Sequence, residues 1–174
     1  MSSKLWEYRG QKRPSFAVEP GDGKESVWDY PRPPRLLPDG RHVEVRLGDL
    51  LIADSMQTYR VLETASPPTF YLPPKDIHTE LLQHCRGSSI CEWKGTAKYW
   101  ALTKGRPSEP VGWSYPNPNP DFEAIAAYFS FYPARVECYV DGERVQPQPG
   151  GFYGGWVTHE VVGPFKGLPG TEQW

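Results

Sequence analysis

The segment CEWKGTAKYW at 91–100 contains residue types suited to ligand binding. Lys94 stands beside a glycine and among the aromatic residues Trp93, Tyr99 and Trp100. If Lys94 projects into a cavity walled by these rings, its ammonium is a compact cation suited to a phosphate or a carboxylate. The alternative interpretation is a lysine in a solvated turn.

Glu63 lies in VLET at 61–64, a run of otherwise strand-forming residues. A carboxylate there could pair with Arg32 or Lys94, or act as a general base if burial raises its pKa. Strand alternation offers a simpler account, in which Glu63 faces solvent opposite Leu62. Glu63 and Lys94 are therefore the candidate catalytic residues, with both interpretations open for each.

Two tyrosines, Tyr71 and Tyr115, each stand just before a proline-rich turn. A hydroxyl at a rigid strand end could orient a ligand, although tyrosine is also a common packing residue with a polar tip. Both interpretations remain open.

The cysteines and histidines do not form a recognisable metal or nucleophile motif. Three cysteines without a CxxC pair and four scattered histidines argue against a structural zinc site and against a disulfide framework. The thiol of Cys91 could be a nucleophile, but no histidine lies nearby to activate it, and a buried structural cysteine is the other interpretation. We predict no metal and no cofactor.

The charge balance and hydropathy exclude several classes of partner. Lys and Arg total 19 against 21 Asp and Glu, so no basic surface is available for duplex nucleic acid. The longest apolar stretches are far shorter than the roughly 20 residues of a membrane helix, and the first residues lack a signal-peptide core. We expect a cytoplasmic protein that does not bind membranes.

Composition predicts a β-rich, loop-rich chain, since 20 Pro and 17 Gly break helices and 24 aromatic residues favour pleated surfaces. We expect one structural domain, with an extended N-terminal arm at 1–40, a β core at 41–146, and a Gly-rich tail at 147–174 that packs on the core. Alternating apolar residues predict hairpins at 43–55 and 136–145, further strands at 58–65, 69–72 and 111–115, and a strand pair at 89–93 and 96–103. Helical spacing predicts short helices at 75–84 and 121–132.

Several motifs resemble the domain of unknown function 427 family, which is also filed as nucleotidyltransferase family 9. They occur in the order ESVWDYPRPPRL (25–36), YRVLETASPPTFYLPPKDI (59–77), CEWKGTAKYW (91–100), GWSYPNP (112–118) and FYPARVECYVDGERV (131–145). The resemblance implies a mainly β domain of twisted antiparallel sheets, similar to the tent-like sheets of the Mss4-like group but without its zinc cysteines. It also implies a shared cleft lined by motif residues, namely Arg32, Glu63, Tyr71, Lys94, Tyr99, Trp113 and Tyr115.

The transferase designation implies chemistry at a nucleoside triphosphate, which normally needs carboxylates around Mg²⁺. Glu63 has few carboxylate companions in the motifs. We therefore expect binding of a small anionic metabolite or nucleotide, with or without catalysis: Glu63 and Lys94 would act on the ligand, and Arg32, Tyr71, Tyr99, Trp113 and Tyr115 would hold it. The alternative is a non-catalytic module whose aromatic arms bind a protein partner or form a homodimer.

Overall fold

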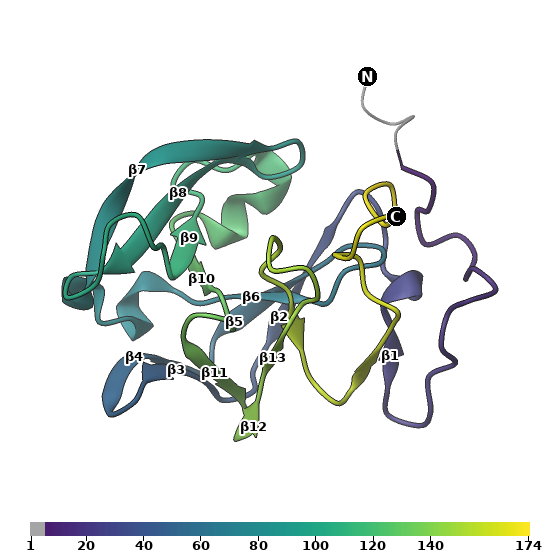
Figure 1. Cartoon of the computed structure of the whole chain (residues 1–174), viewed down its shortest axis with the longest axis horizontal. Helices are drawn as coiled ribbons and strands as arrows, with labels where there is room; N and C mark the ends of the chain where they lie inside the picture. Colours follow the sequence, from purple (N-terminus) through teal and green to yellow (C-terminus); the bar gives the residue numbers. More distant parts are fainter. Residues whose placement is uncertain (1–5) are drawn as a thin grey trace.

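A computed structural model of the chain describes residues 6–174 and consists mainly of small, mostly antiparallel sheets (Figure 1). The predicted mainly β fold class is confirmed. Within these residues, three sheets of three or four strands carry the core, and two further two-stranded pairs join the outer segments. No helix in this part of the chain is long and apolar enough to cross a membrane.

The first sheet has the strand order β12-β11-β3-β4 and contains both predicted hairpins. Its strands are β3 (Val43–Leu47), β4 (Leu50–Ser55), β11 (Glu137–Val140) and β12 (Glu143–Arg144). The alternating residues of β3 and β11, such as Val45 and Cys138, are fully buried. Asp141 and Gly142 both have positive φ, at 47° and 81°, the conformation that an Asp-Gly hairpin turn adopts readily.

Two further sheets meet side by side, with β7–β9 at the upper left of Figure 1 and β2, β5 and β6 across its middle. One has the order β10-β9-β8-β7, with β7 (Leu82–Cys91), β8 (Gly95–Leu102), β9 (Gly112–Ser114) and β10 (Phe129–Phe131). The other has the order β2-β5-β6, with β2 (Arg35–Asp39), β5 (Thr58–Leu62) and β6 (Thr69–Tyr71). Leu72 and Phe129 exchange backbone hydrogen bonds of 2.8 and 2.9 Å, which join the two sheets.

The helix predicted at 75–84 is replaced by two single 3₁₀ turns, η3 (Pro74–Asp76) and η4 (Thr79–Leu81), followed by β7. The register of β7 against β8 shifts between His84 and Ser88, so a β-bulge interrupts the strand. Extra residues in a bulge alter the period-2 alternation, and Leu82 and Cys85 are both buried although they are three residues apart. The apparent helical spacing therefore arises from a bulged strand.

The helix predicted at 121–132 is likewise only a short 3₁₀ segment, η5 (Pro120–Ile125). Ala127 then has a φ of 62°, which ends any helix, and residues 129–131 form β10. All three residues of β10 are buried and pair with β9, so tertiary pairing overrides the local helical pattern. The N-cap position of this segment is Asn119.

The two outer segments of the chain lie against each other and against the β2-β5-β6 sheet. β1 (Glu25–Ser26) pairs in parallel with β15 (Val161–Val162), and β13 (Gln146–Pro147) pairs with β14 (Trp156–Val157). After β1, in η2 (Val27–Asp29), the buried Trp28 indole donates a 3.1 Å hydrogen bond to the Pro164 carbonyl. Trp174 packs against Trp28 and Phe16 with ring centroids 5.1 Å away from each. Residues more than 100 positions apart thus share one aromatic cluster.

An ion-pair network fastens these segments to the end of β2. Asp39 pairs with Arg41 at 2.8 Å and with Arg60 at 3.2 Å. Arg41 also pairs with Glu160, and Arg60 with Glu25. Burial acts to raise the pKa of Asp39, but the Arg41 hydrogen bonds and the two arginine charges outweigh burial and hold that pKa below its ordinary value.

The lowered pKa of Asp39 predicts a specific loss of stability in acid. Because the unfolded chain binds the proton more tightly, the contribution of Asp39 is complete above about pH 5 and is lost as the pH falls through its folded pKa. Asp39→Asn should therefore reduce the free energy of unfolding at pH 7 by about 3 kcal/mol and make it less dependent on pH in acid. Urea unfolding between pH 3 and pH 7 measures both effects.

Asp49→Asn is the matched control, since Asp49 is exposed in the β3–β4 turn. If the free energy of unfolding depends on pH equally in Asp39→Asn and Asp49→Asn, the role assigned to this network is wrong.

Candidate functional site

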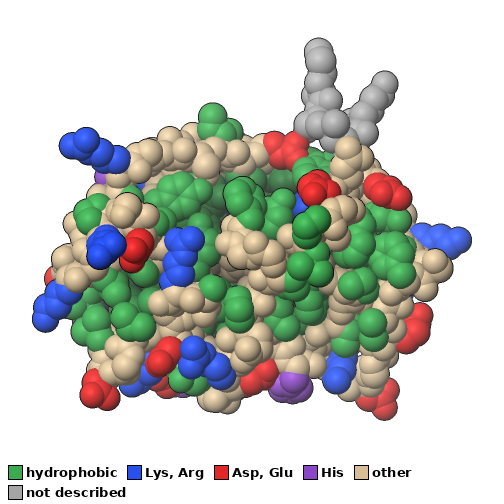
Figure 2. All heavy atoms as spheres, viewed as in Figure 1, with side chains coloured by type: hydrophobic (Ala, Val, Ile, Leu, Met, Phe, Trp, Pro, Cys, Tyr) green, Lys and Arg blue, Asp and Glu red, His purple; other side chains and the backbone are tan. Residues whose placement is uncertain are grey.

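A cavity of about 590 Å³ opens where the β10-β9-β8-β7 and β2-β5-β6 sheets meet the C-terminal segment. Its walls come from the end of β5, from β6, from the β7–β8 hairpin, from β9, and from residues 148–155 together with Lys166. Figure 2 shows hydrophobic side chains gathered where this face of the molecule is hollowed, beside the hairpin. A cavity of this volume is within the usual range for small-molecule sites.

Lys94 enters this cavity from the turn between β7 and β8. The turn is fixed on its outer side, where Asn119 donates its backbone N–H to the Lys94 carbonyl and its side-chain amide to the Trp93 carbonyl, both at 2.9 Å. The Lys94 ammonium lies 5.7 Å from the centroid of the Tyr115 ring, a distance that allows a cation–π attraction. The lysine is partly buried against aromatic rings, and the solvated-turn interpretation is wrong.

Aromatic residues form the floor around Lys94. Tyr71, at the end of β6, is almost completely buried, and its hydroxyl accepts a 3.0 Å hydrogen bond from the Trp113 indole N–H. Tyr115 lies beside Tyr71, with ring centroids 6.4 Å apart. On β8, the Tyr99 hydroxyl lies 2.5 Å from Ser89 Oγ on β7. These hydroxyls and rings give the cavity apolar walls with a few polar groups.

The protonation states of the cavity follow from burial. Burial raises the pKa of Tyr71 and Tyr115 and raises that of Tyr132 to about 12, so these phenols stay neutral and can donate hydrogen bonds. Burial acts to lower the pKa of Lys94, but the net shift is upward, and the Glu63 carboxylate contributes to it at neutral pH. Lys94 is therefore a cation at neutral pH.

A second lysine, Lys166, reaches the cavity from the C-terminal segment. It is only 3% exposed, and its backbone N–H donates to the Ala65 carbonyl at 2.9 Å. Its ammonium lies 4.2 Å from the Trp6 ring centroid and 5.3 Å from that of Tyr153. Burial and the nearby Arg32 charge lower the pKa of Lys166, which means that its charged form is held at an energetic cost.

Glu63 lines the cavity, whereas Arg32 lies behind it. The Arg32 guanidinium is fully buried and donates hydrogen bonds of 3.1 Å to Glu63, 3.0 Å to the Thr64 carbonyl and 2.8 Å to the Tyr8 carbonyl. Glu63 is neither a solvated strand residue nor paired with Lys94. Arg32 holds Glu63 in place.

Six of the seven residues named by the resemblance line this one cavity, namely Glu63, Tyr71, Lys94, Tyr99, Trp113 and Tyr115. Trp100, expected beside Lys94, points to the other face of β8, where its indole N–H donates to Ser114 at 2.9 Å. The sequence reasoning missed Lys166, Trp6 and Tyr153. In the sequence these residues are a lysine and two aromatic residues in segments without a regular pattern. Such segments do not predict where a side chain lies relative to the sheets.

The carboxylates present do not fit the Mg²⁺ that a nucleotidyltransferase would need. Within residues 6–174, no three His, Cys, Asp or Glu side chains lie close enough to hold a metal ion. Of the two carboxylates that line the cavity, Glu63 pairs with Arg32 and Glu92 accepts a 2.8 Å hydrogen bond from the Trp6 indole. Both carboxylates are thus engaged by other side chains of the protein.

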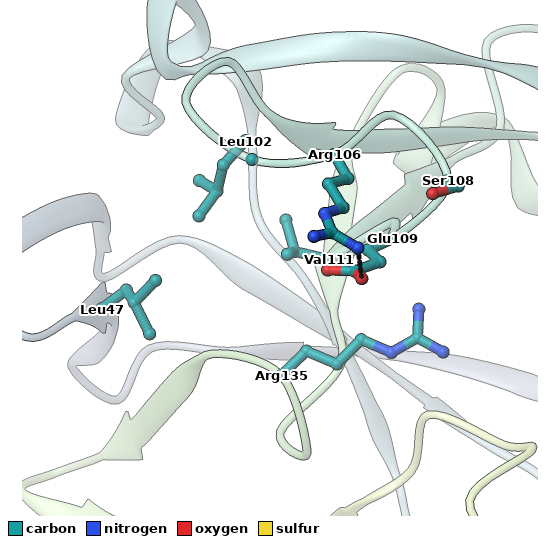
Figure 3. A pocket seen from close by; sticks show the side chains of 8 residues that line it. Leu47, Leu102, Arg106, Ser108, Glu109, Val111 and Arg135 are labelled. Carbon is teal, nitrogen blue, oxygen red and sulfur yellow. Dashed lines mark ion pairs between the residues drawn. The ribbon is translucent and has the colours of Figure 1, made fainter.

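A second hollow, of about 520 Å³, lies between the β8–β9 loop and the end of β3 (Figure 3). Arg106 and Glu109 point toward each other there, at 3.9 Å, and both are strongly exposed. Arg135 donates to the Pro110 carbonyl. Because its charged groups are satisfied within the chain and face solvent, this hollow offers a ligand less than the first cavity does.

The fold and cavity define a small, mainly β protein with a lysine-containing aromatic pocket. The family model described as Domain of unknown function (DUF427), and labelled NTP_transf_9, matches residues 35–142. The chain belongs to this family. The matched range includes Glu63, Tyr71, Lys94 and Tyr115, whereas Arg32 and Lys166 lie outside it. No curated protein matches the chain significantly.

The hydrogen bond between Trp113 and Tyr71 predicts a measurable contribution of the cavity floor to stability. Tyr71→Phe removes the acceptor and leaves the buried indole N–H unpaired, which should lower the free energy of unfolding by about 1–3 kcal/mol. Urea denaturation measures the change. Tyr139→Phe, at a partly exposed tyrosine on β11, is the control and should change stability by less than about 0.5 kcal/mol. Equal effects of the two substitutions would contradict this account of the floor.

Proposed function

We propose that the protein binds a small organic anion, with a phosphate or carboxylate group, in the cavity that contains Lys94 and Lys166. A nucleotide is one ligand of this class. The observation that carries the proposal is the presence of two ammonium groups in one aromatic cavity. Neither ammonium forms an ion pair with any side chain of residues 6–174.

The charges around the cavity favour an anion. Lys94 and Lys166 line the cavity together with Glu63 and Glu92, and the charge of Glu63 is already paired with Arg32 behind the cavity. The Glu172 carboxylate also acts electrostatically on Lys166. Buried lysine charges are costly unless they are paired, and proteins keep such groups mainly at functional sites. The lowered pKa of Lys166 reflects this cost. A bound anion would pair with the two ammonium groups.

Each part of the cavity has a physical role in this proposal. Lys94 and Lys166 neutralise the anionic group, and the neutral Tyr115 phenol donates a hydrogen bond to it. The Trp113 ring packs against the carbon skeleton of the ligand. Glu63, oriented by Arg32, accepts a hydrogen bond from a ligand hydroxyl or amine.

Binding without chemistry is the function that this geometry supports best. A carboxylate paired with a guanidinium is stabilised as the anion and is a poor general base. Glu63 is paired with Arg32 in this way. Cys91 also lines the cavity, but none of the histidines within residues 6–174 does, so the thiol lacks the base that a Cys–His nucleophile would use.

The proposal predicts that both lysines are needed for anion binding. Adenosine 5′-monophosphate and methyl phosphate should raise the melting temperature and give a binding isotherm by calorimetry, whereas adenosine should bind far more weakly. At a ligand concentration of 100 Kd the stabilisation is about 2.7 kcal/mol. Lys94→Met and Lys166→Met should each weaken binding at least tenfold, since each removes one charge-assisted contact.

Lys104→Met is the matched control, because Lys104 is an exposed lysine in the β8–β9 loop and does not line the cavity. The proposal is wrong if no phosphate or carboxylate up to the size of adenosine 5′-monophosphate raises the melting temperature. It is also wrong if Lys94→Met and Lys104→Met bind the anion equally well.

Lys166 also gives a prediction for the ligand-free protein. Because the folded state lowers the pKa of Lys166, its charge destabilises the fold at neutral pH, and this cost disappears as the pH rises through the lowered pKa. Lys166→Met should therefore raise the free energy of unfolding at pH 7 by about 1 kcal/mol, and the gain should shrink at alkaline pH. Chemical unfolding at pH 7 and pH 10 measures it. A loss of stability at pH 7 would instead indicate a structural role for the ammonium.

A further inference from the structure

The mouth of the cavity differs chemically from its interior. Ile90 and Phe152 are 82% and 78% exposed, which makes them the two most exposed large hydrophobic side chains of the described residues. Both line the cavity that contains Lys94 and Lys166. Isolated exposed apolar side chains are common, but two on the rim of one cationic cavity form a local apolar patch.

The two rim residues come from different segments of the chain. Ile90 lies on β7 beside the hairpin turn, and Phe152 lies in the glycine-rich segment 150–155. The neighbouring Tyr153 packs edge-on against Phe152, with centroids 4.9 Å apart, and also covers Lys166. The apolar rim is therefore continuous with one of the two cationic groups inside.

We propose that the ligand is an amphiphilic anion, whose charged group lies at Lys94 and Lys166 and whose hydrocarbon part leaves the cavity between Ile90 and Phe152. This inference rests on the proposed function and specifies the ligand class. A wholly polar anion, such as free phosphate, gains nothing from an apolar rim. A hydrocarbon chain covers both exposed side chains and removes their apolar surface from water.

The rim is a small patch at the mouth of a cavity, which favours a chain or ring of a ligand over a folded partner. Stable protein interfaces bury about 800 Å² on each side, far more than two side chains supply. The charge complementarity also lies inside the cavity, at the lysines, where a small ligand reaches and a protein surface does not.

The test is a series of n-alkyl phosphates with methyl, butyl, hexyl and octyl chains, titrated calorimetrically below their critical micelle concentrations. Affinity should rise by up to about fourfold for each CH₂ that the rim covers and then level off once the chain passes it. The variant Ile90→Ser/Phe152→Ser should bind methyl phosphate as the unmodified protein does but lose most of the gain with chain length. Met56→Ser is the control, because Met56 is 63% exposed and does not line the cavity.

Each outcome decides between the two proposals. Methyl phosphate binding that depends on Lys94 but does not increase with chain length would overturn the amphiphile and leave the proposed function standing. A chain-length gain that survives Ile90→Ser/Phe152→Ser would also overturn it, since the chain would lie elsewhere. If sedimentation shows a dimer that this double variant abolishes, the rim binds a second copy and the inference is wrong. Absence of binding across the series would overturn both proposals.

Titration with octanoate tests whether the anionic group of the ligand is a carboxylate or a phosphate. A carboxylate that binds as tightly as octyl phosphate supports fatty-acid-like ligands, whereas a clear preference for octyl phosphate supports phosphorylated ones. If Lys166→Met no longer binds the preferred ligand and Lys104→Met still does, the charged group lies at Lys166 as proposed.

Discussion

Thr64 and Ala65, at the corner where β5 ends, hold the terminal segments of the chain against the sheets. The Thr64 hydroxyl donates a 2.6 Å hydrogen bond to the Tyr30 carbonyl, and the Ala65 N–H donates to the Val27 carbonyl at 3.0 Å. The Ala65 carbonyl accepts from the Lys166 N–H at 2.9 Å. Both corner residues are fully buried, and buried polar backbone groups must be paired. The corner therefore fixes the N-terminal arm, the end of β5 and the C-terminal segment relative to one another.

The cavity depends on this arrangement because its walls come from parts of the chain that are distant in sequence. The corner places Glu63 on one side and Lys166 on the other, while the β7–β8 hairpin brings Lys94 to the floor. The C-terminal segment can approach the floor only at a glycine, since a Cβ on Gly154 would lie 2.4 Å from the Trp113 ring. The range matched by the family model supplies the floor and one lysine, and the outer segments supply the second lysine and part of the rim.

The distribution of ion pairs sets the cavity apart from the rest of the fold. Around Asp39, arginines and carboxylates neutralise one another and tie the arm and tail to β2. At the cavity, Arg32 pairs with Glu63 from behind, and two ammonium groups face aromatic rings. Aromatic faces attract cations but compensate the loss of water only in part. This asymmetry is the physical basis for our proposal that the cavity binds an anion.

The sequence by itself determined the strands whose pattern is local and the family to which the chain belongs. The Asp141-Gly142 hairpin and the β3–β4 hairpin follow from alternation and turn chemistry, which depend only on neighbouring residues. The family motifs also named most of the cavity lining, because Lys94, Tyr71 and Tyr115 stand at strand ends within conspicuous sequence runs. These features needed no knowledge of distant contacts.

Tertiary structure alone decided the features that depend on long-range pairing. The bulge in β7 and the pairing of β10 with β9 replaced both predicted helices, because backbone hydrogen bonds across the sheet outweigh local helical spacing. Lys166 joined the cavity because its backbone bonds to a corner about 100 residues earlier, which no local pattern records. Arg32 was recognisable as a site residue, yet only the fold placed it behind Glu63 rather than in the cavity.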